Sequence, residues 1–184
     1  MIYGFSFNNR HSSEFEIFMK SDDRTLLPAK TQAAYMIPGR DGTYDSGDFD
    51  YQNRIITVQI AFFGANNDME SLRKKVRDIA KWLSGQGNLI FDDEPDKAYT
   101  AKVTSGISLS QIVRQGQATV SFDCQPFAES IEYLTRVKDI TENNSTLSIP
   151  VEGTQDAPCI ITIKNTGTED VTGITIQRKA EVKI

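Results

Sequence analysis

The sequence predicts a mainly β (α+β) fold with one helix, and three observations lead to this prediction. Apolar and polar residues alternate over several short runs, turn-forming residues separate these runs, and in one segment the apolar spacing changes from two to three and four. A chain of 184 residues can bury one good core, or one core and a small second one. We expect two domains, at residues 1–128 and 129–184, because the character of the sequence changes between them.

The first runs predict a hairpin followed by a long connection. Apolar residues alternate over residues 3–7 and again over 15–19, and the polar residues 8–13 separate them. Residues 21–53 are less regular and rich in Asp, Gly and Pro. Such a stretch is too long for an ordinary connection inside a compact domain, and we expect it to act as a lid, a binding loop or an arm laid on a partner.

The clearest strand and the single helix come next. Within residues 54–63, the side chains that point one way are Ile56, Val58, Ile60 and Phe62. The helix is predicted at residues 68–84, with an apolar stripe of Met69, Leu72, Val76, Ile79, Ala80 and Leu83. Asn67 and Glu70 match a capping-box start, and Gly85 fits the position just past the end.

Further strands are expected on both sides of residue 128. Residues 88–91 and 99–104 flank the acidic turn 92–96, and a hairpin is expected from 107–114 and 118–124. Beyond residue 128, three strands are predicted at residues 146–151, 159–164 and 173–177, with a turn at 165–169. This is the composition of a β-sandwich, but the strands are too few to close two sheets. We therefore expect a second domain that is reduced or cut short.

Charge, hydropathy and cysteine content exclude several classes of protein. The formal net charge is −5 with acids and bases interspersed, so no basic footprint for a sequence-specific nucleic-acid binder is present. The basic residues of the helix predict a solvated face or a contact with an acidic neighbour. No apolar run is long enough to cross a membrane, and the first residues do not resemble a signal peptide, so we expect synthesis in a cytoplasm. Cys124 and Cys159 are expected to be buried free thiols.

No residue pattern in the chain predicts a catalytic, cofactor or metal site. His11 is the single histidine, and a solvated loop histidine is expected there rather than a base for Ser12 or Ser13. Residues 92–96 lack the glycine and terminal glutamate of a calcium-binding loop, and residues 39–42 lack the spacing of a phosphate loop. Trp82 is expected in the core. We therefore expect a protein that is not an enzyme.

Five ordered segments carry a resemblance to a known family. They are Phe5-Ser6-Phe7-Asn8, Ile37-Pro38-Gly39-Arg40-Asp41-Gly42-Thr43-Tyr44, Ala80-Lys81-Trp82-Leu83, Leu89-Ile90-Phe91-Asp92-Asp93-Glu94-Pro95-Asp96 and Phe122-Asp123-Cys124-Gln125-Pro126-Phe127. In this order and spacing, residues 1–127 resemble the distal tail proteins of siphophages, which are also found in prophages.

The resemblance implies a structural role in the virion. It implies an N-terminal tail-tube-like β-barrel or sandwich with one flanking α-helix, followed by a partial galectin-like β-sandwich. Six copies would form a ring hub at the tail tip, assembled in the host cytoplasm, with DNA passing through the lumen. The ring would join the tail tube protein to the tail-associated fibre or lysin protein, or to baseplate proteins.

The resemblance also implies an intersubunit arm, because an extended segment of the family embraces the neighbouring subunit. By position, residues 33–50 are the candidate. Gly39 and Gly42 allow a sharp turn that presents Arg40 and Asp41. The candidate arm residues are Ile37, Pro38, Gly39, Arg40, Asp41, Gly42 and Tyr44.

Two other classes of function stay open. A carbohydrate-binding module for host adsorption would need exposed aromatic residues on a sandwich, and the C-terminal part offers Tyr133. A cell-wall hydrolase would need paired acids or a histidine-based site in a cleft, for which His11 and the acidic turn are poor candidates.

Overall fold

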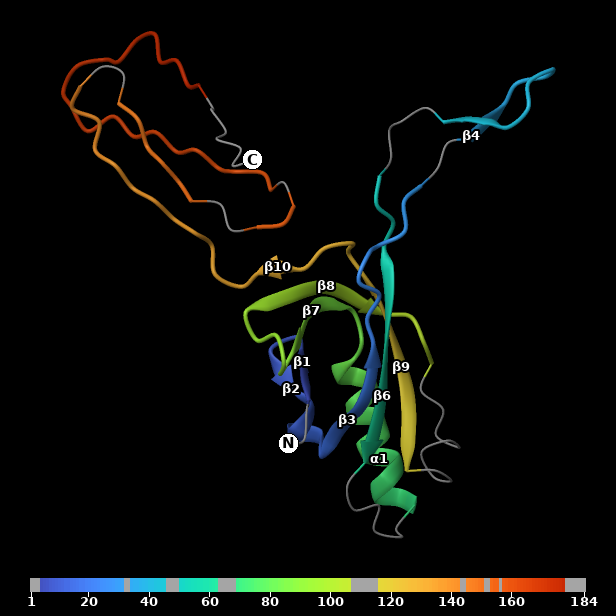
Figure 1. Cartoon of the computed structure of the whole chain (residues 1–184). Helices are drawn as coiled ribbons and strands as arrows, with labels where there is room; N and C mark the ends of the chain where they lie inside the picture. The colour runs from blue at the N-terminus through green and yellow to red at the C-terminus, as the bar shows by residue number, and fades with distance from the viewer. Residues whose placement is uncertain are drawn as a thin grey trace. The chain divides into compact units, whose positions relative to one another are not determined.

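The computed structural model describes residues 4–31, 34–45, 50–62, 69–106, 116–142, 145–150, 153–155 and 157–177 (Figure 1). The chain divides into two compact units, Met1–Leu134 and Thr135–Ile184. No helix in the described part of the chain is long and apolar enough to span a bilayer.

The first unit holds all of the strands and helices that the described residues form. The strands are β1 (Phe5–Phe7), β2 (Arg10–His11), β3 (Ile17–Asp23), β4 (Ala34–Met36), β5 (Thr43–Asp45), β6 (Arg54–Phe62), β7 (Gln86–Phe91), β8 (Lys97–Val103), β9 (Gln117–Cys124) and β10 (Glu129–Ser130). The 3-10 helix η1 spans Ser12–Phe15, and the α-helix α1 spans Met69–Trp82. The predicted mainly β fold with one α-helix is confirmed.

The strands form one antiparallel sheet and one separate hairpin. The main sheet has eight strands in the order β2-β1-β7-β8-β9-β6-β3, with β10 paired to β8. β4 and β5 pair only with each other among the described strands. The two long central strands, β6 and β9, pair from Arg54↔Cys124 to Ala61↔Gln117, and β3 pairs with the other side of β6.

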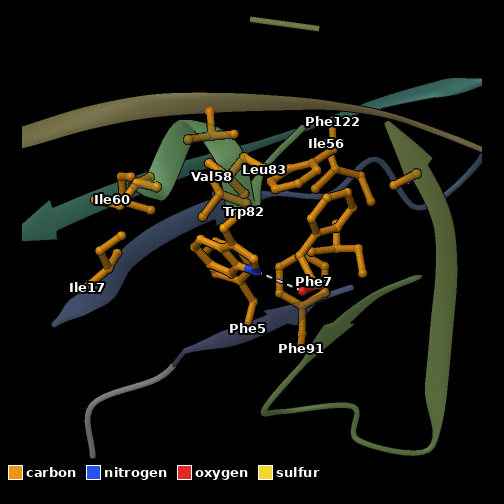
Figure 2. Packing of buried hydrophobic residues seen from close by; sticks show 14 of the residues in the cluster. Phe5, Phe7, Ile17, Ile56, Val58, Ile60, Trp82, Leu83, Phe91 and Phe122 are labelled. Carbon is orange, nitrogen blue, oxygen red and sulfur yellow. Dashed lines mark hydrogen bonds between the residues drawn. The ribbon is translucent and has the colours of Figure 1, made fainter. Parts of the chain in front are cut away.

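The buried hydrophobic residues of the described part of the chain form one cluster between this sheet and α1 (Figure 2). Ile56, Val58 and Ile60 are fully buried on one face of β6, as the alternation predicts. From the helix, Ile79, Trp82 and Leu83 pack into the same cluster. Ala80, which the predicted stripe included, is exposed, because the helix turns Trp82 rather than Ala80 toward the sheet.

The predicted hairpin between residues 3–7 and 15–19 is wrong. Asn8 and Asn9 have φ of 51° and 61°, and Phe7 pairs with Arg10 across them. These are the positive angles that a two-residue type I′ turn requires, so β1 turns back immediately to form β2. β3 pairs with β6 instead of β1, because η1 lies between β2 and β3.

Other predictions near the helix are confirmed or lie outside the described residues. Gly85, with φ of 88°, follows the end of α1 as expected. The predicted cap Asn67 and the predicted strand 107–114 lie outside the described residues.

The second unit differs from its prediction. Its described residues form no strand, so the strands expected at 159–164 and 173–177 are not found there, and residues 146–150 of the strand expected at 146–151 form none either. The turn at residues 165–169 is present, because the Gly167 N–H donates to Asn165 Oδ1 at 2.9 Å. Glu129 and Ser130 pair with β8 and belong to the first unit. The galectin-like sandwich and the boundary at 128/129 stay predictions.

Candidate functional site

The candidate arm residues form a hairpin with a tight loop. β4 and β5 pair as Ala34↔Asp45, Tyr35↔Tyr44 and Met36↔Thr43. The Arg40 N–H donates to the Ile37 carbonyl at 3.2 Å. With Pro38 second and Gly39 third at φ of 85°, these four residues have the composition of a type II turn.

The loop presents a charged pair to solvent. Gly42 also has a positive φ, of 87°, and returns the chain to β5. Between the two glycines, Arg40 and Asp41 are exposed. The sequence-based interpretation of Gly39 and Gly42 is therefore confirmed at the level of geometry. The structure brings Ile37 to Gly42 together in one loop and places Tyr44 in β5.

The arm is joined to the sheet by a two-stranded root. The Thr31 N–H donates to the Asp50 carbonyl at 2.9 Å, and the Gln52 N–H donates to the Ala29 carbonyl at 2.7 Å. Between these bonds, Lys30 bridges Tyr51 and places its ammonium 4.9 Å from the ring centroid. The stretch expected to be irregular therefore contains an antiparallel ribbon.

The root is fixed to the body by aromatic and cationic contacts that the sequence did not reveal. Tyr51 packs edge-to-face against Phe127 with ring centroids 4.8 Å apart. The Arg54 guanidinium lies 4.5 Å from the centroid of the Tyr99 ring and donates from Nη1 to the Thr25 carbonyl at 2.9 Å. These partners lie far apart in sequence, so no local pattern could predict the contacts.

Apolar side chains are exposed along the arm and its root. Leu26 is 99% exposed and Met36 is 84% exposed. The other large apolar residues exposed in this segment are Leu27, Tyr35 and Ile37. Neighbouring exposed apolar residues on an extended ribbon are typical of a surface that a partner covers.

The carboxylates of the acidic turn between β7 and β8 accept hydrogen bonds from donors in the same chain. The Gly4 N–H donates to Asp92 Oδ2 at 2.7 Å. Arg24 reaches over the Phe91 ring to form ion pairs with Asp93 and Glu94. The hydrogen bond from Arg24 lowers the pKa of Asp93 below its ordinary value. Among the described residues, no group of three or more His, Cys, Asp or Glu is arranged to hold a metal ion.

His11 is partly exposed and bonded at both ring nitrogens, and it lies at the end of β2, so the loop position predicted for it is wrong. Nδ1 lies 2.6 Å from Ser13 Oγ and accepts the Ser13 backbone N–H at 3.2 Å, while Nε2 lies 3.1 Å from Asp92 Oδ1. These are the groups of a Ser–His–Asp triad, but here they form a helix cap. His11 is the N-cap of η1, and Glu14 accepts its N–H at 3.1 Å to complete a capping box. Nδ1 therefore accepts the Ser13 backbone N–H in addition to its contact with the Ser13 hydroxyl.

The outer face of α1 borders an open groove of about 680 Å³ between α1 and η1. Phe15 and Trp82, both largely buried, contribute rings to its lining, and Lys74 and Lys81 stand on its helix side. Lys75 also lines the groove and forms an ion pair with Glu16. The groove is therefore lined by aromatic rings and by charges of both signs, and no pattern in the sequence predicts it.

The two cysteines lie in different environments. Cys124 is buried and free, as expected. Burial raises the pKa of its thiol to about 11. Cys159 is free but exposed, which contradicts the prediction of a buried thiol, because the strand expected around it does not form.

Comparison with known proteins agrees with this fold. A family model described as phage tail protein RIFT-related domain matches residues 8–124. The crystal structure of the Dit protein (gp 19.1) of phage SPP1 is similar, with a TM-score of 0.59 and 16% sequence identity over 71% of this chain. That protein is described as a paradigm of the hub adsorption apparatus in phages that infect Gram-positive bacteria. The match covers 52% of its length, so this chain spans about half of it. No curated protein matches the chain.

Proposed function

The chain belongs to the phage tail protein RIFT-related domain family, and we propose that it is a structural distal tail protein of a siphophage. In this proposal six copies form a ring hub at the tail tip. The ring connects the tail tube protein to the tail-associated fibre or lysin protein, or to baseplate proteins. The protein assembles in the host cytoplasm and performs no catalysis.

The arm is the observation that supports this proposal best. A ribbon whose apolar side chains are exposed, with Met36 at 84%, is expected to gain stability when another molecule covers it. Aromatic and cationic contacts at Tyr51 and Arg54 hold its root to the sheet, while the hairpin itself pairs only internally among the described strands. This is what an intersubunit arm requires: a fixed base and an uncovered end.

The charge of the chain suits a ring through which DNA passes. The formal net charge is −5, so the average surface repels phosphate groups. A lumen must not retain the DNA that crosses it, and an acidic protein meets that condition.

The test of the proposal is the mass in solution over a concentration series, measured by light scattering after size exclusion. We expect a species near six times 20.6 kDa that negative staining shows as a ring. A chain that stays monomeric, both alone and with tube and tail-tip proteins, would contradict the proposal.

The arm can be tested separately from the ring. We expect Met36→Ser/Ile37→Ser to weaken assembly about tenfold or more, since each of the two apolar side chains contributes on the order of 1 kcal/mol when buried. The matched control is Ile160→Ser/Ile161→Ser, which removes two exposed isoleucines from the second unit. Unchanged assembly of the arm variant would show that the arm does not join subunits.

A carbohydrate-binding module for host adsorption is the second candidate, because Tyr133 is 88% exposed. Exposed aromatic rings stack on sugar rings in such modules. Saccharide binding at millimolar affinity that Tyr133→Ala abolishes would favour this function, and its absence across cell-wall saccharides would remove it.

A further inference from the structure

The outer face of α1 carries unpaired positive charge. The helix has five basic and two acidic residues, a formal net charge of +3, in a chain whose net charge is −5. Within the described part of the chain, four of these bases form no ion pair. We call them the basic face: Arg73, Lys74, Arg77 and Lys81. Such a concentration of like charge lowers helix stability unless a counter-charge lies nearby.

The groove beside this face adds an apolar component. Phe15 and Trp82, which line the groove, stack on each other with ring centroids 4.4 Å apart. Of the bases that line it, Arg10 is paired with Glu14 and Lys75 with Glu16. Lys74 and Lys81 form no ion pair with a described residue, and neither does Asp78, the third acid of the lining, so both lysines can meet an acid of another molecule. A partner that combines carboxylates with apolar side chains would complement both parts of this surface.

The arm has that combination. Residues 33–50 contain four aspartates and one arginine, a formal net charge of −3. The exposed apolar residues Tyr35, Met36 and Ile37 lead into its loop, and the exposed Asp41 lies in the loop itself. The arm and the basic face are therefore opposite in charge, with a formal net charge of −3 against four unpaired bases.

These two surfaces lie at opposite ends of the same strand. The arm root precedes Arg54 at the start of β6, while Ile17, just after η1 and the groove, pairs with Phe62 at its end. A strand of nine residues is about 30 Å long. Complementary surfaces at opposite ends of one subunit favour head-to-tail contacts between copies, and such contacts form a ring when the rotation between neighbouring copies closes.

We infer that the basic face of α1, with the groove beside it, receives the acidic arm of a second copy of this chain. The inference rests on the proposed function and names the surface that the arm meets. Nucleic acid is the other polyanion that a basic helix can bind, but it would leave the apolar residues of the arm uncovered, whereas a second copy buries them and neutralises the charge together.

A zero-length carbodiimide crosslink tests the contact directly, because it joins a carboxylate to an amine only where the two touch. Equal amounts of ¹⁴N- and ¹⁵N-labelled full-length chain are mixed, crosslinked and digested, and mixed-isotope peptides are identified by mass spectrometry. We expect crosslinks between aspartates of residues 33–50 in one copy and Lys74 or Lys81 in another. The mass of the same sample is measured by light scattering.

The outcomes separate this inference from the proposed function. Rings with arm–α1 crosslinks support both, and smaller oligomers with these crosslinks support the inference alone. Rings without them overturn the inference and leave the ring intact. Monomers without them overturn both. DNA binding by the basic face in place of the crosslinks would also overturn the inference.

A charge-reversal variant checks that the contact is electrostatic. Arg73→Glu/Arg77→Glu leaves Lys74 and Lys81 available for crosslinking, and we expect the arm–α1 crosslink yield to fall about tenfold, since two surface attractions become repulsions. Arg136→Glu/Lys138→Glu reverses two charges outside α1 and is expected to leave the yield unchanged. Equal yields in the two variants would overturn the inference. Circular dichroism confirms that both variants are folded.

Discussion

At the scale of single residues, Trp82 joins the helix to the first strand. Its ring stacks on Phe5 and Phe15, with centroid distances of 5.6 and 4.4 Å. Its indole N–H donates to the Phe7 carbonyl at 2.8 Å in the buried core (Figure 2). One side chain thus supplies the apolar area of a core residue and satisfies a buried carbonyl near the end of β1.

Replacing Trp82 by phenylalanine removes the hydrogen bond to the Phe7 carbonyl and should therefore lower the stability of the fold. Trp82→Phe keeps an aromatic ring but leaves the Phe7 carbonyl without this donor. We expect the free energy of unfolding to fall by about 1–3 kcal/mol, measured by circular dichroism in urea. The exposed substitution Thr119→Val serves as the control and should change it by less than about 0.5 kcal/mol. Equal effects would show that the hydrogen bond contributes nothing.

Cys124 is buried and Cys159 is exposed, so the two thiols should differ in their rate of reaction with a thiol reagent. Burial raises the pKa of Cys124 to about 11, and the thiolate is the reactive form, so Cys124 should not react near pH 8. Cys159 is exposed and should react at once. We expect one fast equivalent per native chain with a disulfide reagent, two after unfolding, and none in native Cys159→Ser. A second fast equivalent in the native wild type would contradict the burial of Cys124.

At the scale of elements, the acidic turn is held to β3 by one arginine. Arg24 follows the last residue of β3 and forms ion pairs with Asp93 and Glu94 beyond the end of β7. β3 is an edge strand and β7 lies inside the sheet between β1 and β8, so the pairs link two strands that are not neighbours. The carboxylates of this turn therefore stabilise the fold, because Asp93 and Glu94 form ion pairs with an arginine from a distant part of the chain.

The Arg24 pairs predict a specific response to acid. Because Arg24 lowers the pKa of Asp93 below its ordinary value of 3.8, the stabilisation is present above pH 3.8 and is lost as the pH falls through the lower folded pKa. Asp93→Asn should therefore lose less stability than the wild type between pH 6 and about pH 2, measured by urea unfolding. Asp139→Asn, an exposed acid with no ion pair in the described part, should behave as the wild type. Parallel curves for wild type and Asp93→Asn would rule out this contribution.

Elements differ in how far the sequence predicts them. β6 and α1 were predictable because nine and fourteen residues give a clear period, and both ended close to their predicted bounds. The pairing of β3 with β6 could not be predicted, because no local sequence pattern shows which distant strands become neighbours. β4 and β5 have three residues each, too few for alternation to be visible. In the candidate site, Gly39 and Gly42 gave the turn, whereas the contacts of Arg54 and Tyr51 depend on the folded sheet.

At the scale of the whole molecule, the two units differ in how much apolar surface they bury. The first buries a continuous core that includes Phe5, Phe91 and Phe122. In the second, Ile160 is 96% exposed, and every described side chain from Thr135 on is exposed. Stability that comes from buried apolar area is therefore concentrated in the first unit. The alternation of isoleucines predicted strands there, but alternation alone does not supply the partner strands that a sandwich needs.

This difference predicts where a glutamate-specific protease cuts first, and the order of cuts tests the boundary between the units. Residues 24–54, which include the arm, contain no glutamate, so this protease does not cut within the arm.

Glu129 pairs with Ala98 in the sheet, and the Ile131 N–H donates to the Asp96 carbonyl at 3.1 Å. A protease needs several residues of extended, unpaired backbone, so cleavage after Glu129 requires β10 to leave the sheet. Glu142 lies in the second unit, in a stretch with neither strand nor helix, and should be cut earlier. We expect mass spectrometry of a time course to show a persistent fragment that ends at Glu142 or Glu132, with cleavage after Glu129 later. First cleavage after Glu129 would instead support the boundary at 128/129, because β10 would then behave as part of the linker rather than of the sheet.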